Sequence, residues 1–564
     1  MLRIISTLSA WLLALSWVGN SHFLPWTSWH SEAIAFLAVF LLGSGALVAL
    51  LLGARPSAIV LPVVSFPFLG LGLIAGIQGI FGLVPFWGDI WAFGLYMALC
   101  VTSSTLGFAA ASATQPNVTP KVSEPFMLLA SVLVIGALAS ALIAFLQIFG
   151  VSSEWIWDSE VRRPGSNLGQ PNHLATLLVM GIASVAFIHR SKKLGGLISI
   201  LLLILLELGI AATESRAGAL SFGGLLVWWL IKRQAIGDRT PRWVGMGAGI
   251  VFVGMFWAWP HLLNAMGLLS YRAEARMLEG SLRLQVWPQL LEALAMHPWT
   301  GWGINQVAPA LNTVADKYAI SEPYTYSHNV VLDLALWIGV PLALLYVCSA
   351  LIWFMRRIHA TSSLLPWYGL AVALPLILHS MLEYPHAYAY FLAPVLFLLG
   401  AVEAATGHRP NFLVDAKPVV VIFLTTIVIL AWSVVEYLKI EEDFRLARYQ
   451  ALRIGSPFPE YQRPRVILFS QLDAILNAAR ITPSPNMSPD ELHMIREAAQ
   501  RYPWSATQYR YALALALNGN PVEGARQFQV IRRMWGEKIY QRLRTQVAEL
   551  ATTQYPVLHQ LDLP

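Results

Sequence analysis

The chain of 564 residues contains 57% hydrophobic and only 12% charged residues, whereas globular proteins carry about 25% charged residues. This composition excludes collagen-like, disordered and disulfide-rich proteins and predicts a polytopic membrane protein. The net charge of +6 would suggest nucleic-acid binding in a soluble protein, but here most basic residues lie between apolar segments. The two cysteines, Cys100 and Cys348, lie in apolar runs and are interpreted as small buried hydrophobic residues.

A helix needs about 20 apolar residues to cross a membrane, and by that criterion the sequence predicts about thirteen spans. Unsatisfied backbone is costly in lipid, so these spans are expected to be helices. The first is also compatible with a signal peptide, but it lacks a clear cleavage site and is kept as a span. The predicted spans begin near Ile4, Ala33, Ala58, Trp87, Pro125, Asn172, Leu194, Ala217, Trp243, His328, Leu364, Ala387 and Pro418.

Lysine and arginine residues fall in every second loop between these spans. Cytoplasmic loops are rich in such residues, so the N-terminus is predicted inside and the C-terminus outside. Some basic residues run against this bias and need another explanation. An arginine at the depth of Arg216 requires a partner, which favours a functional role, whereas long loops cross regardless of charge, which explains Lys317. The exceptions are Arg162, Arg163, Arg216 and, in a long outer loop at about 261–327, Arg272, Arg276, Arg283 and Lys317.

The composition becomes charged and amphipathic from about Glu441 onward. Residues 490–501 and 506–517 have helical spacing of apolar residues, and positions from Tyr509 to Phe528 weakly resemble one tetratricopeptide unit. The predicted fold is therefore all-α: a polytopic transmembrane helical bundle with a large outer loop and a C-terminal soluble helical domain. Its expected boundaries are 1–437 for the transmembrane catalytic domain and 438–564 for the tail.

The signatures of common soluble enzymes are missing from the sequence. There is no Walker loop, dinucleotide-binding glycine pattern, His-Glu-x-x-His or Cys-x-x-Cys, and the histidines lack metal-ligand spacing. Glu207 is the nearest candidate for a mid-span proton relay, and one carboxylate is thin support for an ion-coupled pump. No metal or cofactor is predicted.

Polar residues gather instead at the predicted outer ends of spans, where the fold is expected to bring several of them together. Arginine matches phosphate oxygens in a bidentate manner, and a histidine takes a proton from a hydroxyl near neutral pH. This combination predicts a site for a lipid-linked phosphate or diphosphate. Its members are Arg162 and Arg163 with the segment Gly165–His173, then Ser215, Arg216, Arg283, Ser327, His328, Asn329, Glu383, Tyr384 and Pro385.

The string Gly165-Ser-Asn-Leu-Gly-Gln-Pro-Asn-His-Leu-Ala175, followed by Glu214-Ser-Arg-Ala-Gly218 and Ser327-His-Asn329, resembles the bacterial protein O-oligosaccharyltransferases (PglL type). These enzymes belong to the O-antigen ligase and polymerase superfamily. The resemblance covers essentially the whole chain, and the first string separates protein glycosylators from lipid A-core ligases. One departure is Gly165-Ser166, where the family is expected to have a bulkier residue and then a glycine.

The resemblance implies en bloc transfer of an oligosaccharide from undecaprenyl diphosphate to a Ser or Thr hydroxyl of an exported protein, a pilin or another envelope protein. Such an enzyme lies in the bacterial inner membrane, with its site and tail facing the periplasm. His328 is the expected general base, and the reaction inverts the anomeric carbon without a metal. The expected substrate-binding residues are Arg216 and Arg283, which clamp the diphosphate, with Gln170, Asn172, His173, Tyr384, Asn329 and Arg163. The expected partners are this donor, the acceptor and membrane lipid, without nucleic acid or a cofactor.

Plainer interpretations stay open for several of these residues. A span-end histidine is more often a capping residue, His173 fits a turn and helix start, and the stretch around Arg283 is compatible with a helix lying in the membrane interface. Arg162 and Arg163 are compatible with lipid binding, and Tyr384 with the aromatic belt. Two other functions also remain: ligation or polymerisation onto lipid A-core or a glycan, and transport of lipid-linked sugars.

Overall fold

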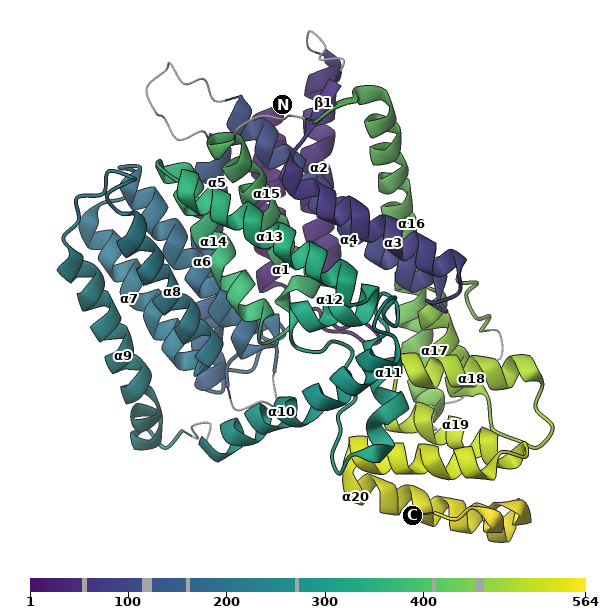
Figure 1. The fold of residues 1–564 in the computed structure, drawn as a ribbon. Helices are drawn as coiled ribbons and strands as arrows, with labels where there is room; N and C mark the ends of the chain where they lie inside the picture. The colour runs from purple at the N-terminus through teal and green to yellow at the C-terminus, as the bar shows by residue number, and fades with distance from the viewer. Residues whose placement is uncertain are drawn as a thin grey trace. The chain divides into compact units, whose positions relative to one another are not determined.

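The computed structural model describes residues 1–52, 58–113, 124–158, 163–268, 273–407, 412–451 and 461–563. These residues are mostly helical, and their one sheet is a pair of short antiparallel strands, β1 (Ala58–Leu61) and β2 (Phe412–Asp415) (Figure 1). The predicted all-α polytopic fold class is confirmed. Arg162 of the predicted site lies outside the described residues.

Ten helical stretches in the described ranges are long and apolar enough to cross a membrane, and two shorter apolar helices, α1 (Leu2–Val18) and α14 (Leu364–Ser380), accompany them. The predicted count of about thirteen spans stays a prediction. The longer helices are α2 (Trp29–Leu52), α3 (Phe66–Ile80), α4 (Trp87–Ser112), α5 (Glu124–Ile148), α6 (Pro171–Arg190), α7 (Gly196–Thr213), α9 (Arg242–Ala265), α13 (Val340–Ala360), α15 (Ala389–Thr406) and α16 (Ala416–Ala451). The predicted start near Ala217 corresponds to α8 (Arg216–Lys232).

Two predicted spans begin differently from the expectation. The segment from Ala58 opens with β1, and helical structure starts only after Pro62, at η1 (Val63–Ser65). The segment from His328 is broken into α12 (Val330–Ile338) and α13 at Gly339, whose φ is +80°. A Cβ at Gly339 would lie 2.2 Å from the carbonyl oxygen of Trp299. The break therefore depends on a glycine that admits both this φ and this backbone approach.

The described chain divides into two compact units, each described here by itself. Unit 1 comprises Met1–Leu71, Tyr96–Ala273 and Cys348–Val428, and unit 2 comprises Gly72–Leu95, Glu274–Val347 and Ile429–Pro564. The predicted boundary between residues 437 and 438 falls within α16, and that domain division stays a prediction.

Helix α6 is the most enclosed span of unit 1, with 83% of its apolar window buried, and it packs against α5, α7, α8 and α14 (Figure 1). Its contact with α8 is close because a Cβ at Gly218 would lie 2.6 Å from the Cβ of Ala175. The glycine in the Ser-Arg-Ala-Gly motif thus brings the first turn of α8 against α6. As a result, Ser215 and Asn172 lie within hydrogen-bond distance at the start of both helices.

Unit 2 contains α10 (Ala273–Met296), α11 (Val307–Val314), η3 (Ala315–Lys317), α12 and the tail helices. The tail consists of α17 (Ser470–Arg480), α18 (Pro489–Arg501), α19 (Ser505–Leu517), α20 (Pro521–Thr553) and η5 (Pro556–Gln560). The helices predicted at 490–501 and 506–517 are confirmed as α18 and α19. The tail is tied to the segment before His328: Arg526 pairs with Asp316 at 2.9 Å, and the N–H of Ser321 donates to the carbonyl of Arg533 at 2.9 Å.

Candidate functional site

The turn before α6, in unit 1, is held by side-chain amides from both flanks. Gln147 accepts from the N–H of Ser166 at 2.9 Å and donates to the carbonyl of Trp157 at 2.7 Å. Asn167 accepts from the N–H of Trp157 at 2.8 Å and donates to the carbonyl of Val18 at 2.7 Å. Ser166 has a φ of +54°, in the left-handed region that glycine favours. This explains why the family pattern is expected to have a glycine where this chain has Ser166.

A histidine next to this turn contributes to holding it. The Nε2 of His22 lies 2.7 Å from the carbonyl oxygen of Asn167, so this nitrogen must donate. The ring of His22 also packs against that of Trp157, with 4.4 Å between centroids. Burial lowers the pKa of His22, although the hydrogen bond to Asn167 opposes the shift. His22 is therefore neutral at pH 7.

Asn172 joins three segments that are distant in the sequence. Its Oδ1 accepts from the hydroxyl of Ser215 at 2.7 Å and from Arg163 at 3.5 Å, and its Nδ2 donates to Glu383 at 3.4 Å. The Nε of Arg163 also donates to the carbonyl of Thr213 at 2.8 Å. The structure thus brings together Arg163, Asn172 and the Ser-Arg-Ala-Gly motif.

Three further predicted residues lie at element ends in unit 1. Arg216 is the first residue of α8, after Ser215, which caps this helix by accepting from the N–H of Gly218 at 3.0 Å, and its side chain is exposed. Gln170 precedes α6 and is half-buried, and its amide makes no capping hydrogen bond. Tyr384 is half-buried, and its ring stacks on Tyr388 at 6.1 Å.

His173 has a different environment, because only 2% of its side chain is exposed. Its ring packs against Tyr388, with 4.5 Å between centroids, and against Phe391 at 5.6 Å. Its Nδ1 lies 3.4 Å from the hydroxyl of Tyr390, whereas its Nε2 has no partner among the described residues. This burial favours a place in the helix core, and the substrate-binding role of His173 stays a prediction.

In unit 2, His328 lies in a turn in which its neighbours are hydrogen-bonded. The N–H of Ser327 donates to Asp333 at 2.6 Å, and Asn329 caps α12 by accepting from the N–H groups of Val331 and Leu332 at 3.0 and 3.1 Å. His328 itself has a φ of +61°, and its half-buried ring packs against Tyr324 at 4.5 Å. Such a conformation costs a non-glycine residue about 1–3 kcal/mol and persists only when its surroundings impose it.

Arg283 lies one helical turn before Trp287 on α10, on the same face of that helix. The indole N–H of Trp287 donates to the carbonyl of Ser327 at 2.8 Å. The face of α10 that carries Arg283 therefore meets the turn that carries His328. Both residues, with Asn329, belong to unit 2, whereas Arg163, Gln170, Asn172, His173, Arg216 and Tyr384 belong to unit 1.

Backbone conformation links these positions in a way that sequence reasoning missed. Ser166, Glu214 and His328 all have positive φ, and each lies in one of the strings that carry the family resemblance. In the described chain, the other non-glycine residues with positive φ are Lys192, Asn305 and Asn486. Gln147 and Trp287 were also missed. A glutamine at the end of an apolar span was the available signal for Gln147.

Comparisons with known families and proteins find relatives over most of the chain. The family described as O-antigen ligase matches residues 198–347, virulence factor membrane-bound polymerase (C-terminal) matches 367–549, and protein glycosylation ligase matches 164–189. A general O-oligosaccharyltransferase of Acinetobacter baylyi is 26% identical over 548 residues, covering 93% of this chain and 92% of the relative. A ComP-specific O-oligosaccharyltransferase of the same organism is 29% identical over 354 residues, covering 61% of this chain and 62% of the relative.

The resemblance to the protein O-oligosaccharyltransferases is confirmed. The chain is thus a glycosyltransferase-type enzyme that is similar to members of the O-antigen ligase superfamily. The protein glycosylation ligase match contains the string Gly165–Ala175 and all of α6 except its last residue, Arg190. The O-antigen ligase match contains Arg216, Arg283 and His328, the three residues expected to neutralise the leaving group and accept the proton.

Proposed function

We propose that this enzyme transfers an oligosaccharide en bloc from undecaprenyl diphosphate to Ser or Thr hydroxyls of exported proteins, such as a pilin or another envelope protein. The observation that carries the proposal is the geometry of His328. Its positive φ is imposed by a turn that Ser327, Asn329 and Trp287 hold in place. Strained residues of this kind cluster at functional sites, and an imidazole suits proton transfer near neutral pH.

In the proposed reaction, the acceptor hydroxyl oxygen attacks the anomeric carbon of the donor. The bond between that carbon and the diphosphate oxygen breaks with inversion, and the hydroxyl proton passes to the imidazole of His328. Such a base contributes about 10²–10⁴-fold to the rate. Arg216 and Arg283 neutralise the charge that develops on the diphosphate, and preorganised charges of this type usually supply the largest contribution. No metal or cofactor enters this scheme.

The contacts in unit 1 support a role for Arg216 on the donor. The Asn172 contacts with Ser215 and Arg163 fix the start of α8, where Arg216 is exposed. The amide groups at a helix start also favour an anion nearby. In this proposal Gln170, Asn172 and Tyr384 contact donor oxygens, Arg163 and Asn329 complete the direct contacts, and the buried His173 acts on the donor through its neighbours at the start of α6.

We further propose that residues 1–437 form the catalytic transmembrane domain, with the loop at about 261–327, and that residues 438–564 present the acceptor protein. The enzyme would lie in the bacterial inner membrane with this tail and the site in the periplasm. The ties of Arg526 and Arg533 to the segment before His328 support the role of the tail. Deletion from residue 441 onward with full transfer to the native acceptor would refute it.

The test uses purified enzyme in detergent with an undecaprenyl diphosphate-linked oligosaccharide, an exported acceptor protein and EDTA. The intact mass of the acceptor is read for the wild type, for His328→Ala and for His297→Ala, an exposed histidine in the same unit. A mass gain equal to the glycan, lost only in His328→Ala, is the expected result. It would also exclude a transporter, because no ion gradient is present.

The O-antigen ligase match favours a second candidate, ligation or polymerisation onto lipid A-core or a glycan chain. No mass gain on the protein with the wild type, but modification of lipid A-core in the same mixture, would replace the first proposal by this one.

A further inference from the structure

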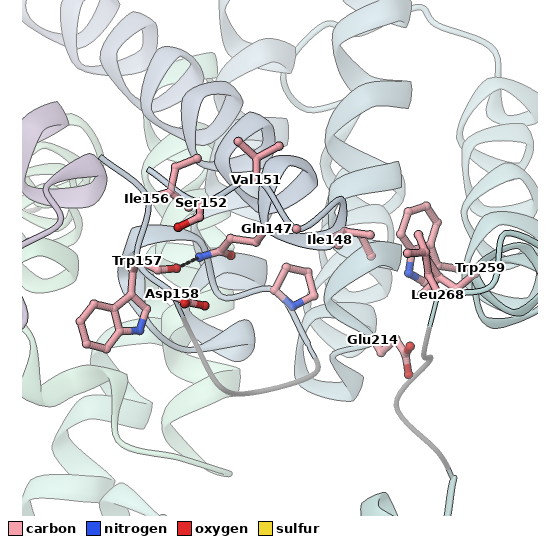
Figure 2. A pocket seen from close by; sticks show the side chains of 14 residues that line it. Gln147, Ile148, Val151, Ser152, Ile156, Trp157, Asp158, Glu214, Trp259 and Leu268 are labelled. Atoms are coloured by element: carbon pink, nitrogen blue, oxygen red, sulfur yellow. Dashed lines mark hydrogen bonds between the residues drawn. The ribbon is translucent and has the colours of Figure 1, made fainter. Parts of the chain in front are cut away.

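A cavity of about 290 Å³ lies in unit 1, beside the segments that carry Arg163 and Arg216. Figure 2 shows its walls, which come from the end of α5, the loop after it, the end of α7 and the end of α9. Glu214 lies two residues before Arg216, and Pro164 directly follows Arg163. The cavity therefore adjoins the residues proposed to bind the donor. This inference rests on the function proposed above.

Trp259 supplies a hydrogen-bond donor that the described protein does not satisfy. Its side chain is 7% exposed, it lines the cavity, and its indole N–H has no partner among the described residues. A buried donor without a partner is unfavourable, because it has lost its hydrogen bond to water without a replacement. An acceptor atom on a ligand in the cavity would remove this cost.

The remaining polar groups of the wall define the chemistry of that ligand. Glu214 and Asp158 both line the cavity (Figure 2), the former buried and the latter exposed, and carboxylates accept hydrogen bonds. The described lining contains no lysine, arginine or histidine to attract an anion. The negative charges of Asp158 and Glu214 would repel a phosphate, so a phosphate is a poor ligand for this cavity. Hydroxyl groups both donate and accept, so they match the indole N–H and the carboxylates together.

The size of the cavity and the apolar part of its wall further restrict the class of ligand. Ile148, Leu263 and the ring of Trp259 line the cavity and offer an apolar surface, which suits the C–H face of a sugar ring. Binding pockets for small molecules typically have about 300–1,000 Å³, so this cavity accommodates a small unit only. We propose that it binds one uncharged sugar unit of the oligosaccharide and thereby selects the donor by its glycan.

The test compares Trp259→Phe, which removes the indole N–H and keeps an aromatic ring, with Trp257→Phe. Trp257 lies on the same helix and is 72% exposed, so it is a matched control. The probe is the oligosaccharide released by mild acid from the donor used for transfer, labelled at its reducing end. Its Kd for the full-length enzyme is measured, and so are KM and kcat for the lipid-linked donor.

We expect Trp259→Phe to raise the Kd of the released oligosaccharide and the KM of the donor about tenfold with kcat unchanged, and Trp257→Phe to change neither value. Glu214→Gln provides a second variant with nearly the same side-chain size, and its expected effect has the same direction. Thermal midpoints of the variants show whether each remains folded.

The experiment distinguishes a failure of the proposed sugar site from a failure of the proposed function. Equal Kd and KM values for both Trp259→Phe and Glu214→Gln and for the wild type would overturn the sugar site, even if the wild type transfers normally. Conversely, a wild type that does not glycosylate protein would overturn the proposed function. The sugar site would still stand if the released oligosaccharide bound the wild type and Trp257→Phe but bound Trp259→Phe more weakly.

Discussion

The turn before α6 and the turn before α12 contain the same backbone conformation, but it serves a different purpose in each. In both, a non-glycine residue with positive φ precedes a helix by a few residues, Ser166 in one and His328 in the other. Ser166 is completely buried, and Gln147 and Asn167 hold its turn as part of a scaffold. His328 is half-buried and is itself the proposed base. In the proposed mechanism, the strained residue thus supports the site in unit 1 and takes part in the reaction in unit 2.

The largest effect on transfer is expected when His328 is replaced by glycine, which tests whether the two turns differ in function. Glycine accommodates positive φ, so His328→Gly should stabilise the protein by about 1 kcal/mol. Transfer should nevertheless fall about 10²–10⁴-fold, because the imidazole is lost. Thermal midpoint and initial rate are measured on the same preparation. A stabilised variant with normal transfer would show that His328 has only a structural role.

Gln147→Leu tests the scaffold side of the comparison. The substitution removes the partner of the Ser166 N–H and of the Trp157 carbonyl. Leaving such buried groups unsatisfied costs about 1–3 kcal/mol each. We expect a lower thermal midpoint in detergent and reduced transfer. A midpoint equal to that of the wild type would argue that Gln147 does not hold the turn.

Ser166→Gly is the matched control for His328→Gly, and its expected effect on transfer is smaller. Relief of the positive φ should raise stability by about 1 kcal/mol, as for His328. Here, however, transfer should be retained, since the hydroxyl of Ser166 is buried and is assigned no part in the reaction. Loss of transfer in a stabilised Ser166→Gly variant would place Ser166 among the functional residues.

The smallest expected effect concerns pH. Burial lowers the pKa of His22 below its ordinary value of 6.5, so the unfolded chain binds more protons than the folded one in the window just below 6.5. Stability from His22 is therefore present above pH 6.5 and decreases as the pH falls below it. Thermal midpoints across pH 5–8 should show a decrease that is smaller in His22→Gln. Equal pH profiles would exclude His22 as the cause.

The sequence allowed the helices to be predicted better than the contacts between them. Long apolar runs and the amphipathic tail fix where helices start, as α4 and α19 illustrate. The break at Gly339 was missed, because an isolated glycine in an apolar run does not reveal its φ or the nearby carbonyl of Trp299. The hydrogen bond between Asn172 and Glu383 joins residues 211 positions apart, and periodicity contains no information about such a pair.

The conformation of the motifs was also beyond sequence reasoning. Residue types identified Arg216 and His328 as candidates, because arginine and histidine suit phosphate binding and proton transfer. Positive φ at Ser166, Glu214 and His328 is a tertiary property, imposed by distant partners such as Gln147 and Trp287. The motifs therefore identified candidate residues for the chemistry, whereas the contacts that hold these residues in place could not be predicted from them.

The backbone hydrogen bond between Ser321 and Arg533 has a mechanical consequence. This hydrogen bond connects α20 to the chain seven residues before His328. The salt bridge between Arg526 and Asp316 is a second connection, a few residues earlier in the chain. A force applied to α20, by a docked polypeptide or by a fused tag, is thus transmitted to the segment that leads into the strained turn. Spectroscopic labels on α20 and beside His328 should consequently report the same motion.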